Sequence, residues 1–164
     1  MTNKPLFGKY RGIVLNNVDP MQIGRVQVRV PDIPKLTQGA WAMPCVPVAG
    51  INSGIYVVPA IGADVWLEFE QGDRNRPICV GGFWKSAGDV PAHSGATSIV
   101  LQTAESGLVI SDQPGPNGGI RIRTATGAMI SISDAGIVIA NGKGAVISMT
   151  GPAVDVNSGA LTVI

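Results

Sequence analysis

Residues 119–141 read GIRIRTATGAMISISDAGIVIAN, in which glycines separate short runs of alternating apolar and polar side chains. Across the last third of the chain, glycine recurs at positions 107, 119, 127, 136, 144, 151 and 159, at intervals of 12, 8, 9, 8, 7 and 8 residues. Such alternation is typical of β-strands, and a repeat near eight residues is too short for a helical repeat. The stretch therefore predicts a β-solenoid of short stacked strands, with a turn at each glycine. A flexible glycine-rich tail is the alternative, but such tails lack regular apolar alternation.

The repeat also indicates how many chains build this rod. Each run offers two or three apolar positions on one face, whereas a solenoid formed by one chain needs about 20 residues per turn to enclose a core. Three chains, each supplying one wall, would enclose it, and strand edges paired between chains would not stay open. We therefore expect a homotrimeric prism, an intertwined triple-stranded β-helix. The expected trimer core is Ile122, Ile130, Ile132, Ile139, Ile147, Val154 and Val156, and the expected outward residues are Arg121, Arg123, Ser131 and Asp155.

Residues 6–85 follow a different pattern, in which strand-like runs are separated by turn signals. The run 24–30 alternates strictly and places Val26, Val28 and Val30 on one face. The run 64–69 does the same with Val65, Leu67 and Phe69, and residues 54–59 are expected to form another strand. Five or six short strands over this length predict a small barrel, with the OB-fold as the expected kind. The whole chain is thus expected to be all-β.

Composition excludes several classes of protein. Charged residues make up 14% of the chain, against about 25% in an average soluble domain. No apolar stretch is long enough for a transmembrane helix, and residues 1–5 do not resemble a secretory signal. A net charge of +1 gives no electrostatic reason to expect binding to nucleic acid or to a membrane. Cys45 and Cys79 are expected to be buried free thiols, with a disulfide as the alternative.

The sequence predicts no catalytic, cofactor or metal site. One histidine, His93, and two distant cysteines give little material for a nucleophilic triad or a zinc site. Glu68 and Glu70 share one side of a strand but are interpreted as solvated carboxylates. Residues 115–119 lack the Lys-Ser/Thr pair of a phosphate-binding loop, and residues 112–119 are expected to be an irregular loop.

Several motifs of the first half together resemble a known family. They are Asn17-Val18-Asp19-Pro20, the run GRVQVRVP at 24–31, the run IGADVWLEF at 61–69, and Gly72-Asp73. This pattern, over roughly residues 8–85, resembles the OB-fold domain of contractile-tail spike proteins. These include the central spike of phage baseplates, the valine-glycine-repeat spike of type VI secretion and the short spikes of extracellular injection particles. Locally, Asp19-Pro20 is expected to start a turn, Gly62 to permit a tight strand entry, and Gly72-Asp73 to end a strand.

The resemblance implies an organisation and a function. Residues 1–85 would form the barrel, 86–106 a linker too short for an inserted enzyme, and 107–164 the spike. The chain would be a non-enzymatic spike at the front of an inner tube that perforates a target envelope and touches its membrane transiently. Phage tail, secretion system and extracellular particle all stay open, as does effector cargo. The protein would assemble in the cytoplasm without a signal peptide and then enter a virion or a secreted particle.

The expected partners lie at the two ends of the chain. A separate hub or baseplate protein would bind the barrel end, and a conical PAAR-like tip protein would cover the apolar segment Leu161, Thr162, Val163 and Ile164. Two alternatives from other classes stay open. One is an OB-type nucleic-acid-binding module with a trimeric stalk, and the other is a receptor-binding fibre shaft.

Overall fold

The computed structural model describes residues 4–33, 36, 38–91 and 97–163, and the chain divides into two compact units at Asp89. As the sequence predicts, the described residues are all-β apart from short 3-10 turns such as Glu70–Gly72 and Ala87–Asp89. None of the helices in these ranges is long and apolar enough to cross a membrane.

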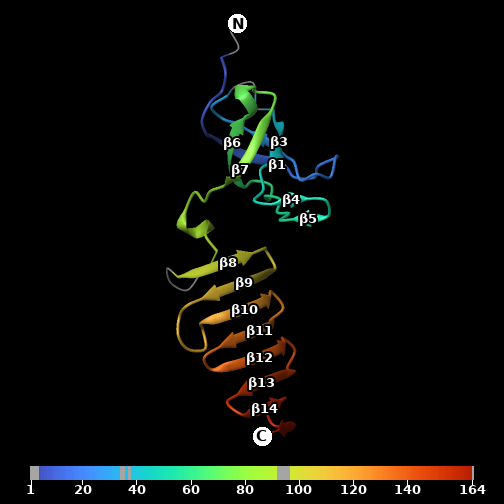
Figure 1. Cartoon of the computed structure of the whole chain (residues 1–164), viewed down its shortest axis with the longest axis vertical. Helices are drawn as coiled ribbons and strands as arrows, with labels where there is room; N and C mark the ends of the chain where they lie inside the picture. The colour runs from blue at the N-terminus through green and yellow to red at the C-terminus, as the bar shows by residue number, and fades with distance from the viewer. Residues whose placement is uncertain (1–3, 34–35, 37, 92–96, 164) are drawn as a thin grey trace. The chain divides into compact units, whose positions relative to one another are not determined.

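The first unit is built around a closed barrel of five strands, in the order β1-β2-β3-β7-β6 (Figure 1). Only β3 and β7 pair in parallel, and every other pair in the barrel is antiparallel. The predicted small barrel is therefore confirmed. The strands are β1 (Tyr10–Asn16), β2 (Val26–Arg29), β3 (Ala40–Pro44), β6 (Asp64–Phe69) and β7 (Pro77–Gly82).

The barrel core follows the alternation of the sequence. Val26, Val28 and Val30 are almost completely buried, and Val65, Leu67 and Phe69 fill the same core from β6. Side chains of successive residues in a strand point to opposite faces, which is why these two triplets share the interior. One strand prediction is wrong: residues 55–60 are irregular, and only Ser53–Gly54 (β5) pairs, forming a small hairpin with Ala49–Gly50 (β4).

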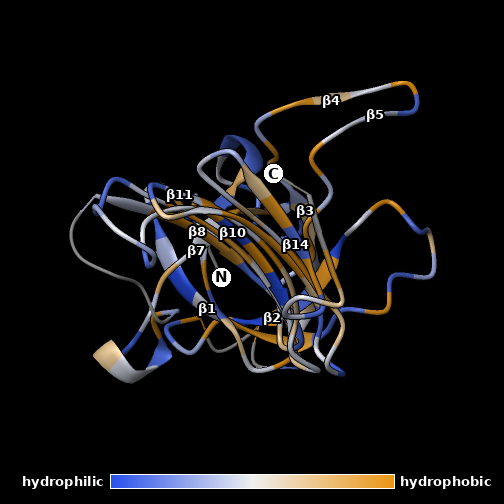
Figure 2. Ribbon diagram, turned by 90° about the horizontal axis from the view of Figure 1, so that it is seen from below, coloured by the Kyte–Doolittle hydropathy of each residue, from blue (hydrophilic) through white to orange (hydrophobic). Residues whose placement is uncertain are grey.

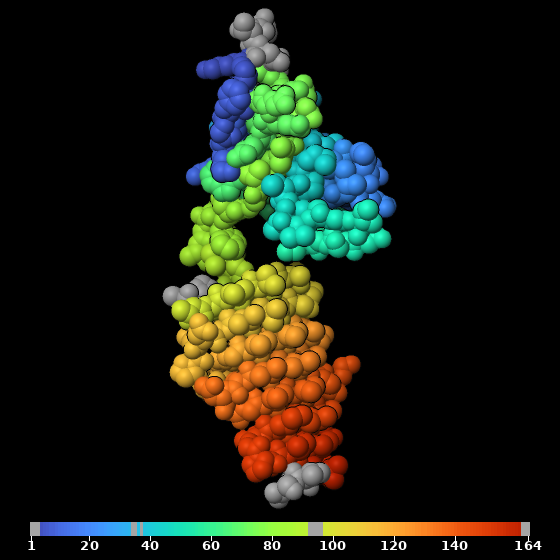
Figure 3. Space-filling model, in the orientation of Figure 1, coloured from blue at the N-terminus to red at the C-terminus, as the bar shows by residue number. Residues whose placement is uncertain are grey.

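The second unit is one eight-stranded sheet in which each strand pairs antiparallel with the next along the chain (Figure 1). In the space-filling view this unit appears as successive bands from yellow to red, in chain order (Figure 3). The sheet begins at Ser98, inside the segment 86–106 that was expected to be a linker. The loop expected at 112–119 is present, because no strand lies between Ser111 and Gly119. The strands are β8 (Ser98–Gln102), β9 (Ser106–Ser111), β10 (Gly119–Thr124), β11 (Ala128–Ser133), β12 (Gly136–Asn141), β13 (Val146–Thr150), β14 (Ala153–Val156) and β15 (Leu161–Val163).

This topology corrects two expectations about the repeat. The chain meanders instead of winding as a solenoid, because most of the turns reverse the chain within a few residues and so make consecutive strands antiparallel. The ladder hydrogen bonds that were expected between chains are formed within one chain. In one chain the backbone hydrogen bonds of the inner strands are therefore already made, whereas the apolar side chains on the face of the sheet stay exposed.

Gly136 shows why glycine recurs in the repeat. Its φ is +134°, and a Cβ atom at this position would lie 2.1 Å from the carbonyl oxygen of Met149 on β13. Only glycine adopts such a conformation readily and permits this approach of two backbones. Not every glycine of the repeat marks a turn, however, since Gly107 lies inside β9.

Candidate functional site

The centre of one face of the eight-stranded sheet is made of apolar side chains, while Ser106, Thr124 and Asn141 lie on the same face at the ends of their strands. The strand register places Ile120 between Ile110 and Ile132, and it places Ile122 between Leu108 and Ile130. The same pairing continues through the sheet, so that the apolar residues form two parallel ladders. One ladder is Leu101, Leu108, Ile122, Ile130, Ile139, Ile147, Val156 and Leu161, and the other is Ile99, Ile110, Ile120, Ile132, Ile137, Met149 and Val154.

The seven residues predicted for the trimer core all belong to these ladders. In the single chain Ile122 is 49% exposed and Ile132 is 43% exposed, while Val154 and Val156 are half-buried. Figure 2 shows the strands of this sheet coloured largely as hydrophobic. An exposed, continuous apolar face of this extent is typical of an interaction site. The face is the candidate functional site, and its occupancy by partner chains stays a prediction.

The opposite face of the sheet is mixed. Arg121, Arg123 and Asp155 lie on it, as the alternation predicts. Ser131 lies on this outward face as well, as predicted, and its side chain is buried there. The reason is its small size: its cross-strand neighbours are Arg121 and Val138, which are larger and cover it.

The predicted tip interface is described only in part. Leu161 and its neighbours form β15, which pairs with β14 at the edge of the sheet. The Leu161 side chain is exposed. Ile164 lies outside the described residues, and so do the side chains of Thr162 and Val163. The interface with a tip protein therefore stays a prediction.

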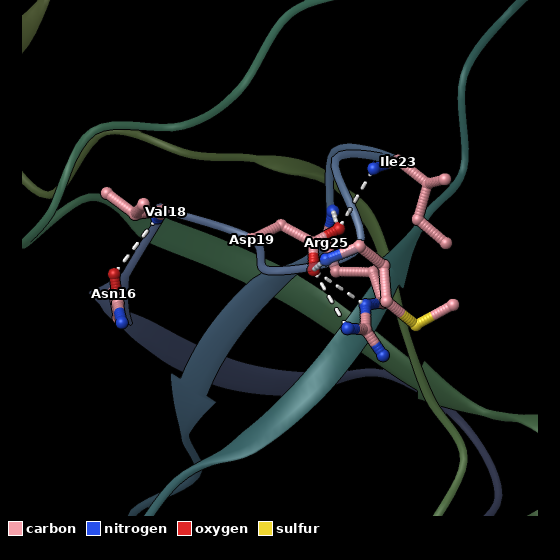
Figure 4. A network of polar contacts seen from close by, with 6 residues as sticks. Asn16, Val18, Asp19, Ile23 and Arg25 are labelled. Carbon is pink, nitrogen blue, oxygen red and sulfur yellow. Dashed lines mark hydrogen bonds and ion pairs between the residues drawn. The ribbon is translucent and has the colours of Figure 1, made fainter.

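Asp19, which was expected only to start a turn, organises a loop on the barrel (Figure 4). Its buried carboxylate accepts hydrogen bonds from the backbone N–H groups of Met21, Ile23 and Arg25 at 3.0–3.2 Å. It also accepts two from the Arg25 guanidinium, at 2.8 Å from Nη2 and 3.1 Å from Nε. The sequence signal that could have revealed this network is an aspartate just before a proline-containing loop with an arginine at its far end.

These contacts fix the charge state of the network. The Arg25 guanidinium holds the pKa of the Asp19 carboxyl well below its usual range; burial acts in the opposite direction, and the three backbone N–H groups add to the lowering. Arg25 also lies 5.3 Å from the centre of the Trp41 ring. Its positive charge is thus neutralised within the barrel, which disfavours a phosphate-binding role for this side chain.

The two glutamates considered as an acid–base pair are engaged in separate ion pairs. Glu68 forms an ion pair with Lys9 at 2.7 Å, and Glu70 forms one with Arg76 at 2.8 Å. The two carboxylates therefore have separate partners and are not paired with each other for acid–base chemistry. No group of three metal-ligating side chains occurs among the described residues, and His93 lies outside them.

Both cysteines are free, but only one is buried. Cys79 is buried, and this burial raises the pKa of its thiol. Cys45 is exposed, contrary to prediction, because it follows the end of β3 at the rim of the barrel. The Cys45 N–H group donates to the carbonyl oxygen of Cys79 at 2.9 Å, so the two residues are neighbours through their backbones.

Comparison with protein families gives two matches that correspond to the two units. Residues 10–84 match the model of the type VI secretion system/phage-baseplate injector OB domain. Residues 98–162 match that of the phage baseplate V C-terminal trimerisation domain. No curated protein matches the chain. The first match confirms the OB-type barrel, and the second supports the expected homotrimer and assigns the trimerisation role to the unit that carries the apolar face.

Proposed function

Because the chain belongs to the family of baseplate spike proteins of phages and type VI secretion systems, we propose that its trimer perforates a target envelope at the front of an inner tube. The observation that carries this proposal is the unbroken apolar face of the second unit. Three such faces, turned toward a common axis, would make a solid prism without a channel.

The structure of the sheet suits a mechanical load. Its inner strands are hydrogen-bonded to a neighbour on both sides within the same chain. A force that separates the chains would therefore leave the hydrogen bonds between these strands intact. Full burial of one isoleucine side chain stabilises a protein by about 1.5–3 kcal/mol. Several isoleucines per chain are about 40% exposed before assembly, and their burial would stabilise the prism along its whole length.

Perforation is testable with particles that carry spike variants. Target envelopes loaded with dye would be mixed with particles assembled from wild-type chain or from Ile132→Asp chain. We expect contraction to release dye only with the wild type, because Ile132→Asp would bring three carboxylates together in an apolar core. Particles with Arg123→Ser on the opposite face are the matched control and should release dye normally. Equal release by all three kinds of particle would contradict the proposal.

We also propose that a small conical tip protein covers the end of the sheet at β15, as PAAR-like proteins do for related spikes. The support is the exposed side chain of Leu161 on an edge strand, since open edges and apolar ends normally carry a covering element. Deleting residues 160–164 should preserve the trimer and abolish capture of a tip subunit from particles. Capture at the wild-type level by the shortened chain would show that the tip protein binds elsewhere.

The remaining expectations about assembly follow from the same role. We propose that a separate hub protein binds the barrel end, that the spike is a structural component without catalytic activity, and that it resides in a virion or a secreted injection particle. Effector cargo is compatible with this role. The nucleic-acid-binding alternative is disfavoured by the small net charge of +1 and by the neutralisation of Arg25.

A further inference from the structure

Residues 36–63 contain no charged side chain, an uncharged stretch without parallel in the first unit. Part of this stretch is the hairpin arm, residues 47–57, which includes β4 and β5 and stands off from the barrel (Figure 1). Every residue of the hairpin arm is exposed. Exposed chain without any charge is unusual on a soluble surface, which normally mixes charged residues of both signs.

Local folding does not explain the composition of the arm. Ile51 lies at the tip of the hairpin and is 96% exposed. Turn positions of tight hairpins are dominated by Gly, Asn and Asp, and a β-branched residue has no local advantage there. The tip therefore carries an apolar side chain that contributes nothing to its own unit.

Between the arm and the barrel lies a hollow of about 560 Å³. Its lining contains no charged residue and includes Ile23, Met43, Val48 and Tyr56. The Tyr56 ring rests against Gly24, where an added Cβ would lie 3.0 Å from its Cε2 atom. Asp19 holds the wall that carries Ile23 in place, because its carboxylate accepts a hydrogen bond from the Ile23 N–H group. The hollow is thus a preformed apolar surface.

We propose that this surface is a second contact between copies of the chain: the hairpin arm of one barrel packs against the barrel of the neighbouring chain in the trimer. The inference rests on the proposed trimeric spike, and it identifies the hairpin arm as the part of each chain that would join the barrels to one another. It would make the barrels a closed ring instead of three independently moving domains.

Two observations favour a second copy as the occupant. Only residues 83–97 connect β7 to β8, and a chain of this length can span at most about 50 Å. Barrels tethered to one trimeric sheet are therefore held near each other at a high effective concentration. The absence of charge also fits a permanent contact, because the buried centres of lasting interfaces are depleted in charged residues.

Thiol labelling of the purified full-length trimer tests the inference. Ile51→Cys would be introduced together with Cys45→Ala, and its reaction with a maleimide would be compared with that of Asp32→Cys, an exposed barrel position, in the same background. The Cys45→Ala chain alone measures the residual reaction of Cys79. We expect Ile51→Cys to react about tenfold more slowly than Asp32→Cys, because covered sites react only when the contact opens.

Equal labelling rates in a chain that light scattering shows to be a trimer would overturn the inference and leave the proposed function intact. A chain that is not a trimer would contradict the proposed function itself. Fast labelling in the isolated trimer with protection only in assembled particles would also overturn the inference, and it would assign the arm to a baseplate protein. A second experiment labels Asn52→Cys, a neighbouring exposed position, with and without Ile51→Asp. We expect Ile51→Asp to leave the mass of three chains unchanged and to make the labelling of Asn52→Cys fast, because the charge would open the contact.

Discussion

Asp19 shows how much one side chain can determine in a loop without regular structure. The loop between β1 and β2 has no ladder of its own, and five hydrogen bonds to one carboxylate replace it. Hydrogen bonds to an ionised acceptor are stronger than neutral ones. The position of Ile23, and with it one wall of the apolar hollow, thus depends on the charge of Asp19.

At this residue scale, we predict that Asp19→Asn lowers the midpoint of thermal unfolding of the barrel by several degrees. An amide cannot accept all five hydrogen bonds, and the half-buried Arg25 would lose its counter-ion. Asp32→Asn removes the same charge at an exposed position and should have little effect. Circular dichroism during heating measures both, and an equal shift in the two variants would contradict the assigned role.

The same carboxylate predicts a dependence of stability on pH. Its pKa is lowered in the folded state, whereas the pKa of an aspartate in an unfolded chain is about 3.9. Its contribution is therefore fully present above about pH 4 and is lost as the pH falls further, toward the folded pKa. The difference in unfolding midpoint between wild type and Asp19→Asn should be constant near neutral pH and should shrink below about pH 4. A difference that grows on acidification would have the wrong sign.

At the scale of the element, adjacent residues of β10 have opposite roles. Ile122 lies on the apolar face, and Arg123 lies on the mixed face. We predict that Ile122→Asp prevents trimer formation, because a carboxylate in the core costs several kcal/mol per chain, whereas Arg123→Asp preserves the trimer. Sedimentation of both variants decides the matter. Loss of the trimer in Arg123→Asp alone would mean that the sheet turns its other face inward.

The close approach of β12 and β13 gives a second prediction at this scale. Gly136→Ala should destabilise the sheet by at least about 1–3 kcal/mol per chain, because alanine at this φ is strained and its Cβ meets the Met149 carbonyl. Gly144→Ala also has a positive φ, but open space surrounds its added Cβ. It should therefore cost less. Denaturant unfolding of the two variants measures the difference, and equal costs would rule out the steric contribution.

At the scale of the whole molecule, the absence of charge on the two ladders has a consequence for assembly. We predict a particle of three times 16.9 kDa whose dissociation does not respond to ionic strength between about 0.05 and 1 M NaCl, because screening acts on charges and not on apolar contacts. Light scattering and sedimentation at both salt concentrations test this. Dissociation at high salt would assign the association to the mixed face with Arg121 and Asp155.

The sequence by itself determined the classes of structure in this protein. Alternation in Gly24–Val30 and Asp64–Phe69 identified the barrel core, because the period of a strand is a local property. The glycine spacing and the isoleucines likewise predicted short strands with one apolar face. These inferences held because each depends on residues only a few positions apart.

Only the tertiary structure decided how the strands are connected and which side chains act at a distance. A repeat of eight residues is compatible with a solenoid wound by three chains or with a meander inside one chain, and only the strand pairing distinguishes them. The burial of Ser131 depends on its cross-strand neighbours. Cys45 and the hairpin arm are exposed because no other segment of the described chain covers them. Such facts come from contacts between distant segments, which local patterns in a sequence do not record.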